Sequence, residues 1–256
     1  MSKRLDGKVT VIVGGASGMG SAMSPIFAAA GARVIIADLD ESAARAVEGY
    51  ELAVGVDVTD EESVRQLAER VEGDVGPVDA VVNTVGFAEF VPATEITYEA
   101  WRNTIDINLS GVFLSCREFG KRMVERRRGK IVNFASTGGL TGVPGMAHYT
   151  AAKHGIVGLT RVLAVEWGKY NVHVNCICPG ATATPMLMSV SDEAWRAKRI
   201  ARIPLLRLGK PEEQARTAMF LISDDSDYLT GAMLTTDGGV SAMAAGTGEE
   251  ILRNDD

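Results

Sequence analysis

The chain has 256 residues, 46% of them apolar and 23% charged, so it can bury a sizeable core, and disorder is excluded as its main state. Its 26 basic and 33 acidic residues give a formal net charge of −7, which argues against general nucleic-acid binding. No apolar run approaches the roughly 18 residues of a membrane span or the core of a signal peptide, and three cysteines without a CxxC pair fit a reducing cytoplasm.

Short β-branched and apolar runs alternate with helix-like segments along the chain. Continuous apolar runs predict strands buried on both faces at 9–13, 33–38, 52–57, 78–83, 130–134, 172–177 and 232–236. Between them we predict an amphipathic helix at 61–72, capped by Asp60, and long helices at about 98–127 and 149–168. This alternation predicts an α/β fold, a single doubly wound domain over 1–256 with about seven parallel strands and helices on both faces.

Two segments break this alternation. Residues 184–210 separate the sixth and seventh strands without forming a strand of their own, and long excursions of this kind often act as lids. We therefore predict a substrate lid at 184–210. The tail at about 246–256 is polar and acidic, and we expect it to be mobile unless it docks, for example at a neighbouring subunit's cleft.

The first predicted strand runs into a glycine-rich turn, Gly14-Gly15-Ala16-Ser17-Gly18-Met19-Gly20, which a helix follows. Such a turn lets the backbone approach a pyrophosphate closely, and the helix N-terminus adds free N–H groups and partial positive charge. The spacing is Gly-x3-Gly-x-Gly rather than the commoner Gly-x-Gly-x-x-Gly. Taken alone, the turn could also serve only to pack a helix against a strand.

Two carboxylates end the next two strands. Asp38 lies 18 residues after Gly20, where a carboxylate can accept hydrogen bonds from the adenosine ribose hydroxyls and would repel a 2′-phosphate. This favours NAD over NADP; the alternative is that Asp38 caps the next helix. Asp57 could meet the adenine edge, or it could be a carboxylate that the dipole favours at a helix N-terminus.

Tyr149 and Lys153 are one helical turn apart, so both side chains can point into one cleft. A phenol titrates near ~10, and a neighbouring ammonium is expected to lower its pKa, so that it can exchange a proton with an alcohol or a carbonyl. Ser136 ends the fifth strand, 13 residues before Tyr149, and its hydroxyl can hold the same oxygen. A Tyr-x3-Lys pair alone is usually an ordinary helix face. The catalytic interpretation of this pair depends on Ser136 and on the glycine-rich turn upstream.

The combined pattern resembles the short-chain dehydrogenase/reductase family, in its compact branch. The matching positions lie between 9 and 239 and come in family order. The resemblance implies a seven-stranded Rossmann fold and a nicotinamide cofactor. The residues that carry it are Gly14, Gly18, Gly20, Asp38, Asp57, Val58, Asn83, Gly86, Asn108, Ser136, Tyr149, Lys153, Pro179, Gly180, Thr184, Pro185, Asp237, Gly238 and Gly239.

The resemblance also implies roles. Tyr149 resembles the catalytic acid/base, Lys153 the residue that lowers its pKa and holds the nicotinamide ribose, and Ser136 the group that orients the substrate oxygen. Asn108 resembles the asparagine that anchors a proton-relay water through a local break in its helix; read alone, it would be an ordinary polar helix residue. Residues expected to bind NAD, besides Tyr149 and Lys153, are Gly14, Ser17, Gly18, Met19, Gly20, Asp38, Leu39, Asp57, Val58, Asn83, Gly86, Pro179, Gly180, Thr182 and Thr184.

The chain departs from the family pattern at two places near the turn. Val13 stands where a threonine is usual before the first glycine, which removes a hydroxyl from the turn. Asn83-Thr84-Val85-Gly86 replaces the usual Asn-Asn-Ala-Gly, so only its outer residues match. Neither change touches Ser136, Tyr149 or Lys153.

The sequence thus predicts an NAD-dependent oxidoreductase that moves a hydride reversibly between NAD(H) and a secondary alcohol or ketone. Apolar residues in the segments 87–93, 138–146 and 186–203 favour an apolar, cyclic or aromatic substrate, unless they serve only core or lid packing. The lid arginines could bind a carboxylate or sulfonate, or could form a solvated helix face. With three histidines and no Cys/His cluster, no metal site is expected.

Other functions stay open. A nucleotide-sugar epimerase or dehydratase can share the turn and Tyr-x3-Lys, but such chains usually carry a C-terminal sugar-binding domain, and 17 residues follow Gly239. A non-catalytic NAD-binding regulator of the same fold would not need Ser136, Tyr149 and Lys153. A ketoreductase of a carboxylate-, sulfonate- or thioester-bearing substrate is a third possibility, although Asp38 disfavours the NADPH that acyl-carrier ketoreductases use.

The resemblance implies that the chain assembles with itself. Family members are most often homotetramers, and we expect the helices at 98–127 and 149–168 to form the contact. The expected small-molecule partner is the alcohol or ketone substrate. No nucleic-acid or membrane partner is expected.

Overall fold

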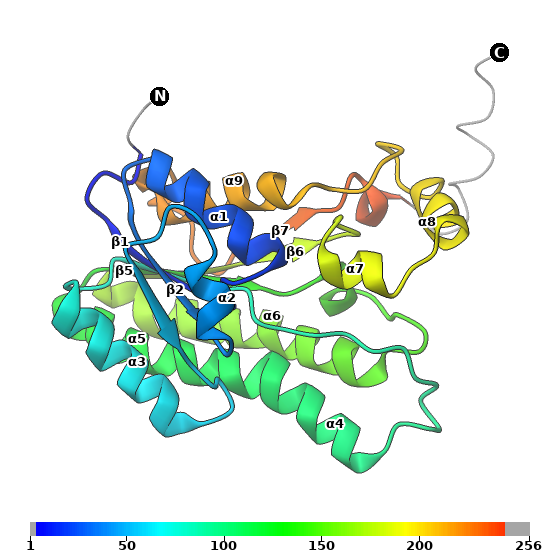
Figure 1. Ribbon diagram of the computed structural model, residues 1–256, viewed down its shortest axis with the longest axis horizontal. Coiled ribbons are helices and arrows are strands. Elements are labelled where there is room, and N and C mark those ends of the chain that lie inside the picture. The colour runs from blue at the N-terminus through cyan, green and yellow to red at the C-terminus, as the bar shows by residue number, and fades with distance from the viewer. Residues whose placement is uncertain (1–3, 244–256) are drawn as a thin grey trace.

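The computed structural model describes residues 4–243, and their strands form one seven-stranded parallel sheet (Figure 1). The strand order is β3-β2-β1-β4-β5-β6-β7, so the direction of winding reverses between β1 and β4. The predicted strands are confirmed, with the third ending at Gly55 and the fourth starting at Ala80. The strands are β1 Val9–Val13, β2 Arg33–Asp38, β3 Leu52–Gly55, β4 Ala80–Asn83, β5 Gly129–Phe134, β6 Val172–Pro179 and β7 Met233–Thr236.

Helices cover both faces of the sheet, as the alternating pattern predicts. They are α1 Gly18–Ala29, α2 Glu41–Arg45, α3 Glu61–Asp74, α4 Tyr98–Ile105, α5 Gly111–Arg126, α6 Ala147–Trp167, α7 Pro185–Ser189, α8 Glu193–Ile200 and α9 Pro211–Ile222. In Figure 1, α1 and α9 lie above the sheet, and α3, α5 and α6 lie below it. Asp60 caps α3 as predicted, since its carboxylate accepts a hydrogen bond from the N–H of Glu62 at 2.9 Å.

The strands are apolar throughout because successive side chains enter two different apolar layers. In β1, Val11 and Val13 pack into the layer that contains residues of α3, α5 and α6. Ile12, between them, packs into the layer that contains residues of α1, α2 and α9. The whole of β1 is therefore buried, and its carboxyl end lies inside the sheet, between β2 and β4.

The predicted long helix at 98–127 is interrupted. A π-helical turn, Asp106–Ser110, joins α4 to α5, and Asn108 lies at its centre. Such turns insert an extra residue into the helix and often mark functional positions. The local break implied by the family resemblance is thus present. The helix predicted at 149–168 is α6, which begins at Ala147.

The segment 184–210 contains the short helices α7 and α8, and a bridge between Thr182 and Gly209 closes its base. This agrees with the expectation that it forms no regular strand. The predicted tail at 246–256 lies outside the described residues.

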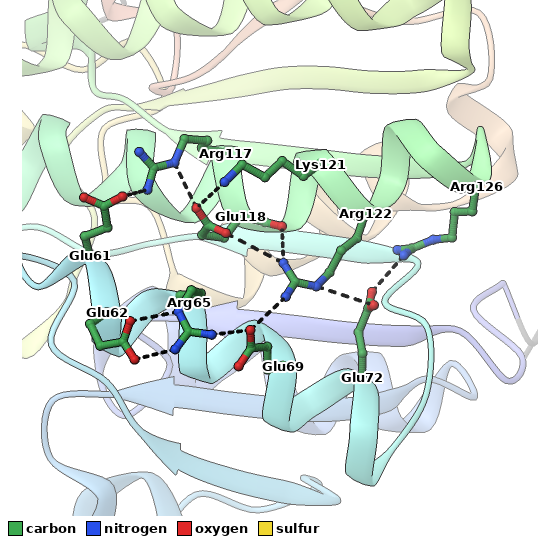
Figure 2. A network of polar contacts seen from close by, with 10 residues as sticks. All are labelled: Glu61, Glu62, Arg65, Glu69, Glu72, Arg117, Glu118, Lys121, Arg122 and Arg126. Carbon is green, nitrogen blue, oxygen red and sulfur yellow. Dashed lines mark hydrogen bonds and ion pairs between the residues drawn. The ribbon is translucent and has the colours of Figure 1, made fainter.

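Ion pairs join α3 to α5 on the side of the sheet away from α1 and α9 (Figure 2). The side chain of Glu118 is only 5% exposed, and its Oε1 accepts hydrogen bonds from Arg117 Nε and Lys121 Nζ, both at 2.9 Å. Burial alone would raise the pKa of Glu118, but the hydrogen bonds from Lys121 and Arg117 hold it below its usual value. The other members of the network are Glu61, Glu62, Arg65, Glu69, Glu72, Arg122 and Arg126.

Candidate active site

A cavity of about 620 Å³ opens at the carboxyl ends of β1, β2 and β4, where the winding of the sheet reverses. In open α/β sheets this crevice is the usual place for a ligand. Many of the residues predicted to bind a cofactor line it: Gly14, Ser17, Gly18, Met19, Gly20, Asp38, Leu39, Asp57, Val58, Gly86 and Thr184. Its remaining lining residues were not predicted to bind the cofactor, although Phe87 and Met186 lie in the expected substrate segments; they are Val56, Thr59, Thr84, Val85, Phe87, Asn103, Ile107, Pro185 and Met186.

The glycine-rich turn forms one wall of this cavity and has no room for side chains. Gly14 and Gly18 have φ angles of +81° and +56°, which favour glycine. A side-chain carbon on Gly20 would lie 2.3 Å from the carbonyl oxygen of Gly14. Ser17 begins α1 without a side-chain capping bond, and the first turn of α1 carries no acidic residue. The first N–H groups of α1 therefore form a site suited to an anion.

The carboxylate of Asp38 lies against this turn. Its Oδ2 accepts a hydrogen bond from the N–H of Ala16 at 2.9 Å, and its Oδ1 accepts one from the N–H of Asp40 at 3.3 Å. The alternative that Asp38 caps the following helix is wrong, because Asp40 is the residue that caps α2, accepting from the N–H of Ala43 at 3.0 Å. Asp38 is thus oriented along the edge of the cavity.

Asp57 also lines the cavity, and its carboxylate is held by its own loop. Its Oδ1 accepts hydrogen bonds from the N–H of Thr59 at 2.9 Å and from the hydroxyl of Thr59 at 2.7 Å. The cap of the following helix α3 is Asp60 rather than Asp57. Asp57 is therefore available to the cavity as a fixed acceptor.

Ser136, Tyr149 and Lys153 come together beyond the end of β5. A side-chain carbon on Gly138 would lie 3.4 Å from Ser136 Oγ and 3.6 Å from Tyr149 Cε1, so the two hydroxyl-bearing side chains flank one glycine. The ammonium of Lys153 lies 5.6 Å from the centre of the Tyr149 ring and donates a hydrogen bond to the carbonyl of Phe134 at 3.0 Å. The lysine is 4% exposed.

Burial controls the protonation of this group. It raises the pKa of Tyr149, against the lowering effect of a hydrogen bond with Ser136. It lowers the pKa of Lys153 to about 8. Burial therefore outweighs the effect of the neighbouring groups on the pKa of the phenol in this structure. The reason is that the ammonium is bound to the Phe134 carbonyl rather than to the phenol oxygen, so desolvation prevails.

Asn108 and Lys153 meet at Gly86. A side-chain carbon on Gly86 would lie 2.6 Å from Asn108 Oδ1 and 3.2 Å from Lys153 Nζ, so only glycine fits there. The Asn108 amide donates to the carbonyls of Phe87 and Thr104, both at 3.1 Å, whereas its buried Oδ1 has no hydrogen-bond partner among the described residues. Because buried polar atoms are nearly always satisfied, this oxygen marks a place for a water or a ligand.

Asn83 does not join the cavity. Its side chain is fully buried, donates to Asn133 Oδ1 at 2.9 Å and accepts from the Ser115 hydroxyl at 2.7 Å. These bonds tie β4 to β5 and α5 inside the core. The structure therefore gives the Asn83 side chain a place in the core, away from the expected cofactor contact.

The loop after β6 is only partly brought to the cavity. Thr184 lines it, and its hydroxyl caps α7 by accepting from the N–H of Leu187 at 3.3 Å. Pro179, Gly180 and Thr182 are not among the residues that line it. Gly180 instead packs against the backbone of Asp237 and Thr182 donates to the carbonyl of Gly180 at 3.2 Å, so both shape the loop.

Two of the three expected substrate segments, 87–93 and 138–146, contact one another. The N–H of Val91 donates to the carbonyl of Gly145 at 2.8 Å, and Phe90 Cδ1 would lie 3.7 Å from a side-chain carbon on Gly145. In the segment 184–210, the Arg196 guanidinium donates hydrogen bonds to the carbonyl and hydroxyl of Ser191. Within residues 4–243, no helix is long and apolar enough to cross a membrane, and no three His, Cys, Asp or Glu side chains gather as a metal ion would require.

Comparison with known proteins identifies the class. A family model described as enoyl-(acyl carrier protein) reductase matches residues 14–241. The chain is 39% identical over 247 residues to D-threitol dehydrogenase of Mycolicibacterium smegmatis, covering 92% of this chain and 94% of that protein. It is 38% identical over 244 residues to the 3-oxoacyl-[acyl-carrier-protein] reductase FabG of Thermotoga maritima, covering 93% and 99%.

One solved structure of a reductase is also similar over nearly the whole chain. The structure of levodione reductase superimposes with a TM-score of 0.89 at 33% identity, over 95% of this chain and 100% of that one. The chain therefore belongs to the short-chain dehydrogenase/reductase family of oxidoreductases, as its motifs indicated. Members of this family use a nicotinamide cofactor.

Proposed function

We propose that this chain transfers a hydride reversibly between NAD(H) and the carbon of a secondary alcohol or ketone. The observation that carries the proposal is the meeting of Ser136, Tyr149 and Lys153 beside a cavity walled by the glycine-rich turn. A phenol, a hydroxyl and a buried ammonium in one place are the groups needed to move a proton to or from an alcohol oxygen.

The cavity fits a dinucleotide. The crowded glycines bring the open N–H groups at the start of α1 within reach of a pyrophosphate, and Asp38 and Asp57 offer acceptors for ribose and adenine. At the other end, Lys153 and Asn108 Oδ1, which has no hydrogen-bond partner among the described residues, favour a polar ligand. The bound cofactor would supply the hydride chemistry. Carboxylate charge at Asp38 favours NAD over NADP.

The residues of the chain then divide the remaining tasks. In alcohol oxidation the Tyr149 phenolate takes the hydroxyl proton, and the Ser136 hydroxyl holds the same oxygen in place. Lys153, whose pKa of about 8 leaves it charged at neutral pH, stabilises the phenolate when the ammonium turns from the Phe134 carbonyl toward the site. Asn108 Oδ1 holds the water that returns the proton to solvent.

The direct experiment measures NADH formation by the purified protein on a panel of secondary alcohols, with NADP in parallel. The panel runs from small aliphatic to cyclic, aryl, carboxylate- and sulfonate-bearing members. We expect turnover with NAD, and best with apolar or cyclic members, because Phe90, Met186 and Met188 offer exposed apolar surface. Preference for NADP would contradict the role of Asp38, and no turnover with NAD bound would favour a non-catalytic regulator.

A ketoreductase of an acidic or thioester-bearing substrate is the second candidate. A FabG enzyme among the relatives favours it. Against it, Arg196 of the lid already donates to Ser191. Best turnover on carboxylate or sulfonate members of the panel would decide for this candidate.

We also propose that the whole chain is one cytoplasmic domain that assembles as a homotetramer through α4–α5 and α6. Phe113 on α5 and Val162 and Val165 on α6 are exposed apolar residues, 41%, 47% and 83% exposed, as a face between copies would require. Light scattering should give the mass of a tetramer, and a monomer at micromolar concentrations would contradict this assembly.

A further inference from the structure

The hydroxyl of Thr84 reaches from one strand end into the glycine-rich turn. Thr84 directly follows β4, and its Oγ1 lies 2.9 Å from the carbonyl oxygens of both Val13 and Gly14. Its backbone N–H donates to the Val13 carbonyl at 2.8 Å. A hydroxyl has one proton to donate, so it serves one of the two carbonyls at a time or is shared between them.

The Gly14 carbonyl lies in a tight place. A side-chain carbon on Gly20, in the first turn of α1, would lie 2.3 Å from the oxygen of this carbonyl and 2.8 Å from Thr84 Oγ1. The Thr84 hydroxyl therefore occupies the space next to this carbonyl and satisfies it. Without this hydroxyl, the Gly14 carbonyl would lose a hydrogen-bond donor. The turn would then shift until the carbonyl reached another donor, because unsatisfied buried acceptors are costly.

The residue before the turn cannot do this. Val13 has an apolar side chain that is 1% exposed and packs in the core layer below the sheet. Thr84, which directly follows the neighbouring strand β4, thus supplies the hydroxyl that Val13 lacks. Thr10, on β1 itself, provides a contrast, because its buried Oγ1 has no hydrogen-bond partner among the described residues.

We propose that Thr84 is a positioning residue for cofactor binding: it ties the glycine-rich turn to β4 and so fixes the N–H groups that receive the pyrophosphate. This rests on the proposed function, because it presumes that the turn binds a dinucleotide. Thr84 also lines the cavity, so the tie lies within the binding surface itself.

The test compares two threonines with the same substitution. Thr84→Val removes the hydroxyl and keeps the shape, whereas Thr10→Val removes a buried hydroxyl that bonds to nothing described. Dissociation constants for NAD and NADP are measured by calorimetry on the wild type and both variants. We expect Thr84→Val to weaken binding of the preferred nucleotide about tenfold, Thr10→Val to leave it within about twofold, and Thr84→Ser to restore it.

A second measurement guards against a variant that folds poorly. Hydrogen exchange of the amides in 14–20 should quicken in Thr84→Ala and not in Thr84→Ser, because only serine keeps the hydroxyl. Equal nucleotide binding and equal exchange in all variants, with a wild type that binds, would overturn this inference alone. If the wild type binds neither nucleotide, the proposed function and this inference fall together.

Discussion

The α3–α5 surface and the cavity at the strand ends use polar residues in opposite ways. On the α3–α5 surface, the nearly buried Glu118 has cationic partners on both sides, and their hydrogen bonds stabilise its charged form (Figure 2). At the cavity, the ammonium of Lys153 is buried beside a single carbonyl, and the oxygen of Asn108 has no partner among the described residues. The first arrangement favours folding. The second costs stability and leaves groups ready for a ligand.

The largest effect should come from the reacting phenol. Tyr149→Phe should lower kcat at least ~100-fold, because it removes the group that exchanges the proton. The stability should change little, and this separates a reacting group from a structural one. The measurement is steady-state turnover on the best alcohol of the panel. Tyr170→Phe, the same change beyond the far end of α6, is the control, and near-normal turnover in Tyr149→Phe would exclude the assigned role.

Lys153→Met should stabilise the fold at neutral pH by up to about 3 kcal/mol while abolishing turnover. Burial holds the pKa of Lys153 at about 8, below the ~10.4 of an unfolded lysine. The folded chain therefore carries an unfavourable buried ammonium below about pH 8, and this cost fades as pH rises toward the unfolded value. Urea denaturation from neutral to alkaline pH measures it. Lys198→Met, exposed on α8, should show no such trend, and a less stable Lys153→Met would contradict the account.

Asp38→Asn should raise the KM for NAD about tenfold, because hydrogen bonds to a charged acceptor are lost. The preference for NAD over NADP should therefore become smaller. Initial rates with both cofactors measure this. Asp40→Asn is the matched control, since Asp40 caps α2 and should affect stability rather than cofactor choice. An unchanged preference in Asp38→Asn would remove Asp38 from cofactor selection.

On the α3–α5 surface, Glu118→Gln should destabilise the fold by about 1 kcal/mol without changing turnover. The pKa of Glu118 is lowered in the folded chain, so its contribution is present above the unfolded value near ~4.3 and is lost as pH falls through the folded value. Urea denaturation at neutral and acidic pH measures it. Glu125→Gln, exposed on α5, is the control. A pH-independent difference would show that the charge of Glu118 is not what matters.

The strand ends could be predicted from the sequence because the signals are local. The glycine turn, Asp38 and Ser136 each directly follow a buried apolar run, and the carboxyl ends of parallel strands meet at one edge of a sheet. Tyr149 and Lys153 needed only the helical period. These site residues could thus be predicted from their spacing along the sequence, whereas their arrangement in space follows from the parallel sheet.

Other features depend on packing that spacing does not show. Asn83 ends a strand like Asp38 does, but the alternation of side chains turns it toward Ser115 and Asn133 in the core. Asn103 reaches the cavity from α4 only through the placement of a whole helix. The direction of the Tyr149 pKa depended on burial and on the carbonyl that holds Lys153, neither of which a Tyr-x3-Lys pattern contains.

The central claim is hydride transfer at this site, and an isotope test addresses it most directly. The protein is given NADH that carries deuterium at its transferable position, together with the ketones that match the alcohol panel, and the products are weighed by mass spectrometry. The account predicts one deuterium on the carbinol carbon of the preferred product, formed at least ~100-fold more slowly when Tyr149→Phe replaces the wild type under the same conditions. Bound NADH without deuterium in any product would contradict it.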